Sequence, residues 1–230
     1  MTADLPASGH RQLWEDRDPQ GRLLASAVLG AAGIEGPLRR FGSDGRPTFE
    51  ADFHDGRLHG VLRAYDDKGA LELEARYRHG LREGLARTFS GGHCVAEQVY
   101  VAGLPSGPLT TYDDLGRTTR SASFVDGRLD GVVRDFHEGR LVREAVWRSG
   151  ALEGEVREFD VRGRLVRSEG YRGNRLHGPM RCYGPDGRVV HETVYRDGVA
   201  LREPGGVAGA SETDGGLAGR LRQWLRGDLP

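Results

Sequence analysis

Six arginines recur at one position of a repeating pattern and are the residues of this sequence best suited to bind a partner. They are Arg39, Arg63, Arg87, Arg134, Arg157 and Arg181, and Thr110 takes the position once. A column of glutamates accompanies them: Glu50, Glu74, Glu97, Glu144 and Glu192. Guanidinium groups bind anions and acidic surfaces, but alternating cross-strand ion pairs explain the same pattern without a partner. Both interpretations stay open, and the candidate partner-binding arginines are Arg63, Arg87, Arg134, Arg157 and Arg181.

Other residue types that support catalysis are present without the spacing that catalysis needs. The 8 histidines do not fall at metal-ligand intervals, although His59 and His177 occupy the same repeat position. Cys94 follows His93 directly, and neighbours on a strand point to opposite faces, which disfavours a nucleophile and base pair. The glycines of residues 30–36 do not form a dinucleotide fingerprint. We therefore expect no catalytic residue, no cofactor, no metal site and no enzyme.

An internal repeat organises most of the chain. Its template is G-x-L-x-G-x-x-R-x-aromatic, then a turn that ends in Gly, then L-x-x-E-x-x-aromatic. Seven units start at Ala32, Gly56, Gly80, Gly103, Gly127, Gly150 and Asn174, at intervals of 24, 24, 23, 24, 23 and 24 residues. Such regularity is typical of a repeat architecture in which each unit packs on its neighbours.

Glycines and aromatic residues keep fixed places in the units. Glycine suits tight turns and close backbone approach, and it fills an inner column (Gly36, Gly60, Gly84, Gly107, Gly131, Gly154 and Gly178) and a turn column. The first aromatic column is Phe41, Tyr65, Phe89, Tyr112, Phe136, Phe159 and Tyr183. The second is Phe53, Tyr77, Tyr100, Phe124, Trp147, Tyr171 and Tyr195. These structural aromatics predict side-chain ladders that cover the neighbouring glycines.

The segments between turns alternate with period two, which predicts β-strands. Val61, Arg63 and Tyr65 would share one face, and Leu62 and Ala64 the other. The two 23-residue units lose their residue before the turn glycine, where a hairpin loop tolerates deletion. We predict an all-β fold: an elongated, single-layered antiparallel sheet of about fourteen strands, a meander of tandem hairpins.

Composition points to a cytoplasmic protein. The net charge is -1, so no basic excess indicates a nucleic-acid partner. The N-terminus lacks the plan of a signal peptide, and no apolar stretch approaches membrane-spanning length.

The predicted organisation has five segments: a disordered N-terminus (1–11), a degenerate capping half-repeat (12–31), seven repeats (32–197), a Gly-rich linker (198–215), and a short amphipathic C-terminal helix with its tail (216–230). The helix would place Leu221, Trp224 and Leu225 on one stripe among arginines. It would cap the sheet edge, or dock on a partner or a membrane surface.

The units resemble the MORN-repeat-variant family. The resemblance rests on GRLHG at 56–60 and NRLHG at 174–178, followed by GRLDG at 127–131, GALEG at 150–154 and GLREG at 80–84. Bacterial proteins of this type are often grouped as antitoxins or immunity proteins that bind and block a toxin, and the family has no catalytic motif. The resemblance implies a protein-binding repeat protein whose partner is a cognate toxin or effector. The alternative is a scaffold or assembly module, with membrane association through the C-terminal helix as one form of it.

Overall fold

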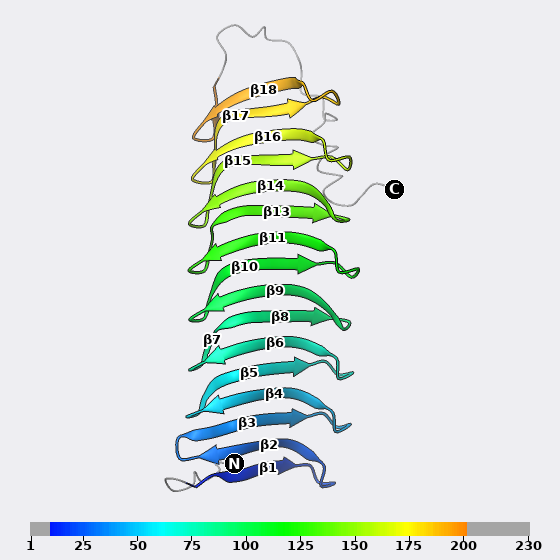
Figure 1. The fold of residues 1–230 in the computed structure, drawn as a ribbon, viewed down its shortest axis with the longest axis vertical. Coiled ribbons are helices and arrows are strands. Elements are labelled where there is room, and N and C mark those ends of the chain that lie inside the picture. Colours follow the sequence, from blue (N-terminus) through cyan, green and yellow to red (C-terminus); the bar gives the residue numbers. More distant parts are fainter. Residues whose placement is uncertain (1–9, 202–230) are drawn as a thin grey trace. The chain divides into compact units, whose positions relative to one another are not determined.

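The chain folds as one antiparallel sheet of hairpins that follow each other in sequence order (Figure 1). A computed structural model describes residues 10–201, and no helix occurs in that range. The strands are β1 (Gln12–Arg17), β2 (Leu23–Gly30), β3 (Gly33–Phe41), β4 (Pro47–His54), β5 (Arg57–Tyr65), β6 (Leu71–Arg78), β7 (Leu81–Arg82), β8 (Gly84–Ser90), β9 (His93–Val101), β10 (Leu104–Tyr112), β11 (Thr118–Val125), β12 (Arg128–Leu129), β13 (Gly131–His137), β14 (Arg140–Arg148), β15 (Ala151–Phe159), β16 (Leu165–Arg172), β17 (Arg175–Tyr183), β18 (Val189–Arg196) and β19 (Val199–Ala200). The predicted all-β antiparallel meander is confirmed.

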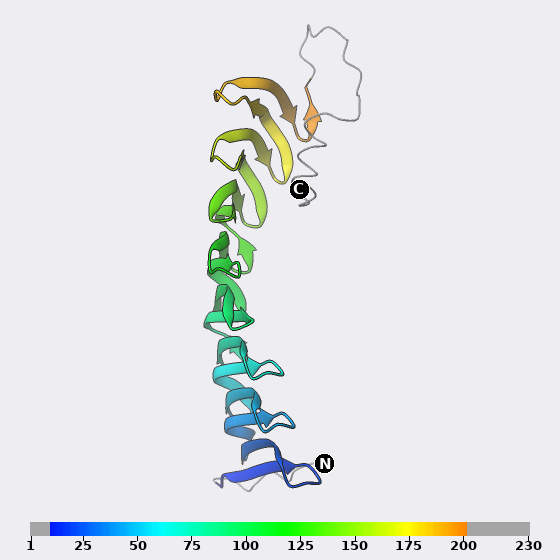
Figure 2. The same ribbon diagram turned by 90° about the vertical axis from the view of Figure 1, so that its right-hand side faces the viewer.

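Each repeat unit forms two strand paths. Two of these paths are interrupted by one residue, at Glu83 between β7 and β8 and at Asp130 between β12 and β13. At both breaks the backbone N–H still donates to the preceding strand, from Glu83 to Arg76 and from Asp130 to Ser123, each at 2.9 Å. Counted as paths, the seven units contribute the fourteen strands that the periodicity predicts. The strands are curved rather than flat (Figure 2).

Two-residue turns connect the units along one edge of the sheet. In the turn Asp55–Gly56 both central residues have positive φ, 49° and 70°, as a type I′ turn requires. The same holds at Gly173–Asn174, where Asn174 replaces glycine with φ 67°. Successive turns are also tied together, because Gly56 N–H donates to Ile34 O (3.0 Å) and Gly80 N–H to Leu58 O (2.8 Å).

The opposite edge carries longer turns in which an aspartate replaces missing backbone partners. In residues 66–69, Asp66 Oδ1 accepts the N–H of Lys68 at 2.9 Å and of Ala70 at 2.7 Å. The two 23-residue units have two-residue turns here instead, Gly91–Gly92 and Glu138–Gly139, with positive φ at both positions. The missing residue therefore shortens a turn and leaves the strands intact.

A row of small apolar side chains runs across one face and forms the core. Leu62 pairs with Ala75 and Val156 with Ala145, and Ala75 and Ala145 are both 0% exposed. Trp147 and Tyr171, from the second aromatic column, pack over this row. Alanine leaves space close to the backbone, so the neighbouring aromatic rings can cover a sheet that has no second layer.

The inner glycines bend each unit's first strand. Gly60 has φ 113° and lies opposite Tyr77, and all seven inner glycines face a second-column aromatic in this way. On its other side the register shifts, so that residues 59–61 together oppose Asp52. Such a bulge demands the backbone freedom of glycine.

The ends of the array differ from the predicted segments in detail. Residues 12–30 form a hairpin, β1–β2, in which Trp14 pairs with Ala27. Val199 and Ala200, in the segment predicted as a linker, still pair with β18. The rest of that linker, the C-terminal helix with Leu221, Trp224 and Leu225, and most of the predicted disordered N-terminus lie outside the described residues. No helix in residues 10–201 is long and apolar enough to cross a membrane.

Candidate functional site

One row of polar residues crosses the face opposite the core, with one residue from each strand path from β2 to β18. The register joins Ser26, Arg39, Glu50, Arg63, Glu74, Arg87, Glu97, Thr110, Ser121, Arg134, Glu144, Arg157, Ser168, Arg181 and Glu192. We call these fifteen residues the polar row. Because one-residue register slips would move side chains to the other face, the bulges and turns must hold this alignment over the whole sheet.

Ion pairs occupy most of the polar row. Nε donates to a glutamate at 2.8 Å from Arg63 to Glu74, 2.9 Å from Arg87 to Glu97, 2.8 Å from Arg134 to Glu144, and 2.5 Å from Arg181 to Glu192. Arg157 binds Glu155 on its own strand at 2.7 Å and approaches Glu144 at 3.9 Å. The five candidate arginines therefore all have intramolecular partners, with side chains 37–49% exposed. Their contact with a partner protein stays a prediction.

The first aromatic column lies on the same face and supports the glutamates. Tyr65 Oη donates to Glu50 at 3.0 Å, and Tyr112 Oη donates to Glu97 at 2.9 Å. The hydrogen bond from Arg87, and then that from Tyr112, lower the pKa of Glu97. The two aromatic columns thus serve opposite faces, the first on the polar row and the second on the core.

The polar row loses its charges in the middle. Glu97 pairs with Thr110, Thr110 with Ser121, and Ser121 with Arg134, so two adjacent uncharged residues interrupt the ion pairs. Both hydroxyl residues are partly exposed. Ser168 also interrupts the alternation of Arg and Glu in the row, but it is buried: it is 1% exposed, and its Oγ lies 3.1 Å from the Tyr183 hydroxyl. The exposed neutral interval is therefore Thr110 and Ser121.

A second column, which sequence reasoning missed, caps the two-residue turns. The residue before the inner glycine is acidic in four units, and its carboxylate accepts the N–H of a turn 19 or 20 residues later. The bonds are 2.9 Å each: Asp55 N–H to Glu35, Ala102 N–H to Glu83, Ser149 N–H to Asp130, and Gly173 N–H to Glu153. The sequence carries a signal for these caps, because the template position before the inner glycine is acidic in four of the seven units.

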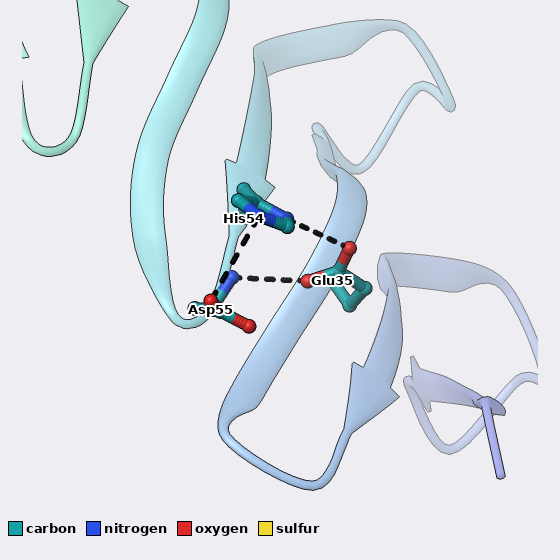
Figure 3. Close-up of side chains that lie close together, drawn as sticks. All are labelled: Glu35, His54 and Asp55. Atoms are coloured by element: carbon teal, nitrogen blue, oxygen red, sulfur yellow. Dashed lines mark hydrogen bonds and ion pairs between the residues drawn. The ribbon is translucent and has the colours of Figure 1, made fainter. Parts of the chain in front are cut away.

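At the first of these caps, one histidine and two carboxylates lie together on the turn edge (Figure 3). Glu35, His54 and Asp55 each offer a possible ligand atom, and these atoms lie within 4.8 Å of one another. Glu35 Oε1 is 3.0 Å from His54 Nδ1. The Asp55 N–H and then His54 lower the pKa of Glu35, while the hydrogen bond to Glu35 raises the pKa of His54. The sequence predicts no metal site, and this grouping of one histidine and two carboxylates leaves that prediction untested.

The remaining concave features are shallow. An open hollow of about 420 Å³ at the N-terminal end of the core face is lined by Trp14, Ala25, Ala27, Leu38 and their neighbours. The two cysteines, Cys94 and Cys182, are free. Burial raises the pKa of the Cys94 thiol, which is the opposite of what an activated nucleophile needs.

Comparison with known proteins adds little. No family model and no curated protein matches the chain. Among solved structures, it is similar to a chain in a crystal structure described as the GtfA/B complex bound to UDP and GlcNAc. The identity is 17% and the TM-score 0.22, over 64% of this chain and 25% of that one. The match thus spans a quarter of the other chain, and we draw no functional inference from it.

Proposed function

We propose that this chain is a non-catalytic protein-binding repeat protein of the MORN-variant type, an antitoxin or immunity protein of a bacterial cytoplasm that neutralises a cognate toxin. The toxin lies across the face that carries the polar row. The resemblance of the repeats supports the class, and the neutral interval at Thr110 and Ser121 supports the place of binding.

The argument for this place is the cost of removing charges from water. A stable protein interface covers about 800 Å² on each partner, and its centre is depleted of charged residues while its rim stays polar. Burying an ion pair under a partner costs desolvation that the pair does not always recover. Thr110 and Ser121 are two adjacent, partly exposed, uncharged residues in the middle of the polar row, flanked by Glu97 and Arg134, whereas Ser26 is a single uncharged residue at its N-terminal end.

The first experiment identifies the partner. The tagged protein is purified from its native cells, and co-eluting proteins are identified. One stoichiometric protein with a toxic enzymatic domain supports the proposal, and co-expression with that protein must then restore cell growth. Failure to protect the cells would contradict the antitoxin role.

Two substitutions test the binding face. The double variant Thr110→Arg with Ser121→Glu completes the row of ion pairs, so the fold should be kept and the affinity for the partner should fall by at least about tenfold. The matched control, Arg39→Thr with Glu50→Ser, creates a neutral pair near the end of the row. The control should bind as the wild type does, and an equal loss in both variants would reject the central position.

A scaffold or assembly module is the second candidate, since an open sheet has edge strands that can pair with another chain. It predicts self-association that depends on concentration, measured by light scattering, and a monomer at high concentration would exclude it. Membrane association through Leu221, Trp224 and Leu225 would require co-sedimentation with anionic liposomes, and this segment lies outside the described residues.

A further inference from the structure

The turn edge of β3, β4 and β5 carries a grouping of donors that neither the repeat nor the proposed function requires. Capping the Asp55 turn needs only Glu35 Oε2, which accepts the Asp55 N–H at 2.9 Å, as the acids of three other units do. Glu35 Oε1 is left to face His54 Nδ1 at 3.0 Å. In the other units the residue at the position of His54 is Arg78, Val101, Val125, Arg148, Arg172 or Arg196.

Two more imidazoles stand next to this group. The rings of His54 and His59 are 5.8 Å apart, and those of His59 and His79 are 5.1 Å apart, measured between centroids. His59 Nδ1 is shielded from solvent and has no hydrogen-bond partner among the described residues. A buried nitrogen without a partner is costly, so the turn edge beside His54 holds an unsatisfied polar atom as well as the two carboxylates.

We propose that Glu35, His54 and Asp55 bind a divalent first-row transition metal ion such as Zn²⁺. Imidazole nitrogen and carboxylate oxygen together are a ligand set for Zn²⁺, at metal–ligand distances of about 2.0–2.2 Å. Two donors at such distances from one ion lie roughly 3 Å apart, which is the separation of Glu35 Oε1 and His54 Nδ1.

The ion replaces the proton in the hydrogen bond between Glu35 Oε1 and His54 Nδ1. Because these two atoms already lie at a suitable separation, the backbone does not have to move for the ion to bind. Glu35 Oε2 keeps the turn in position while Oε1 binds the metal. Arg11, 3.4 Å from Glu35 Oε1, is the competing cation, and its side chain is 70% exposed, so it can turn into solvent. The site is independent of the polar row, which lies in the middle of the strands.

Isothermal titration of the untagged full-length protein with ZnCl₂ tests the site, at about pH 7.5, where imidazole binds metal in its neutral form. The wild type should bind one ion per chain. The variants His54→Ala and Glu35→Gln should each lose at least about tenfold in affinity, because each removes one donor. Glutamine can still accept the Asp55 N–H, so Glu35→Gln keeps the turn capped.

His177→Ala is the matched control. His177 occupies the column of His59 and faces Asp197 at 3.2 Å, but the unit before it has Arg172 where the candidate site has His54. This variant should bind zinc as the wild type does. Absence of binding to the wild type, or unchanged affinity in His54→Ala, would overturn the proposal. Addition of Co²⁺ gives a second readout, since a bound ion with these ligands produces visible absorption that His54→Ala must lack.

Discussion

At residue scale, glycine at position 60 is required by two separate constraints. Gly60 has φ 113°, a conformation that other residues rarely adopt. A side chain there would also place its Cβ 2.9 Å from the Cβ of Asp52 on the preceding strand. Backbone strain and crowding therefore act at the same residue.

Gly60→Ala should destabilise the protein by about 1–3 kcal/mol, the range for strained backbone conformations. Urea unfolding followed by circular dichroism measures the change. Asp52→Gly removes the crowded Cβ and leaves the strain, so Gly60→Ala should cost less in the Asp52→Gly background than in the wild type. If Gly60→Ala is as stable as the wild type, the bulge does not need glycine.

The contact between Glu35 and His54 predicts a defined pH dependence of stability in metal-free buffer. Because the pKa of His54 is raised from 6.5, its contribution is complete below pH 6.5 and is lost as pH rises through the folded-state pKa. Because the pKa of Glu35 is lowered from 4.5, its contribution is complete above pH 4.5 and is lost as pH falls through its folded-state pKa.

The wild type should therefore exceed His54→Gln in free energy of unfolding chiefly between pH 4.5 and 6.5, and the difference should shrink on both sides. Arg11 and Asp55 also face the pair, with opposite effects on His54. Urea titrations over a pH series measure the difference. A constant difference from acid to alkaline pH would show that His54 contributes without its charge.

At the scale of the turn, a single aspartate side chain organises each long connection. Asp66 Oδ1 accepts two backbone N–H groups, whereas the side chain of its neighbour Asp67 is exposed and forms no hydrogen bond within residues 10–201. Asp66→Ala should cost about 1–3 kcal/mol in unfolding free energy, at roughly 0.5–1.5 kcal/mol for each of the two lost bonds. Asp67→Ala, which removes the same group next to it, should cost little in the same denaturation assay.

The strands and turns could be predicted from the sequence because they repeat. Seven copies of a glycine and aromatic pattern determine strand number, turn position and the face of each column. The acidic preference before the inner glycine was visible in the repeat, but its capping role and the grouping with His54 were not, since Glu35 and Asp55 are 20 residues apart and come together only when a bulge and a type I′ turn set the register. Thr110 was visible as the exception among the arginines, but its neutral partner Ser121 is identified by cross-strand pairing.

For the array of hairpins, stability should behave as a sum of local contributions, because each strand pairs with its sequence neighbours. Ala145→Leu would overpack the core row, where Ala145 is 0% exposed. Hydrogen exchange should then accelerate in β13 to β16 and stay unchanged in β2 to β6. Uniform acceleration over all strands would mean that the array unfolds as one cooperative unit.

Because the register of the polar row is unbroken, the number of units sets the distance between positions on the binding face. Each unit adds two strands, or roughly 10 Å of binding surface, and leaves the face and phase of every other unit unchanged. Duplication of one 24-residue repeat would therefore separate the strands on its two sides by roughly 10 Å more. The pairing between neighbouring strands would stay the same. Partners could be distinguished by the spacing of their contact points, with the number of units as the variable that changes from one protein to the next.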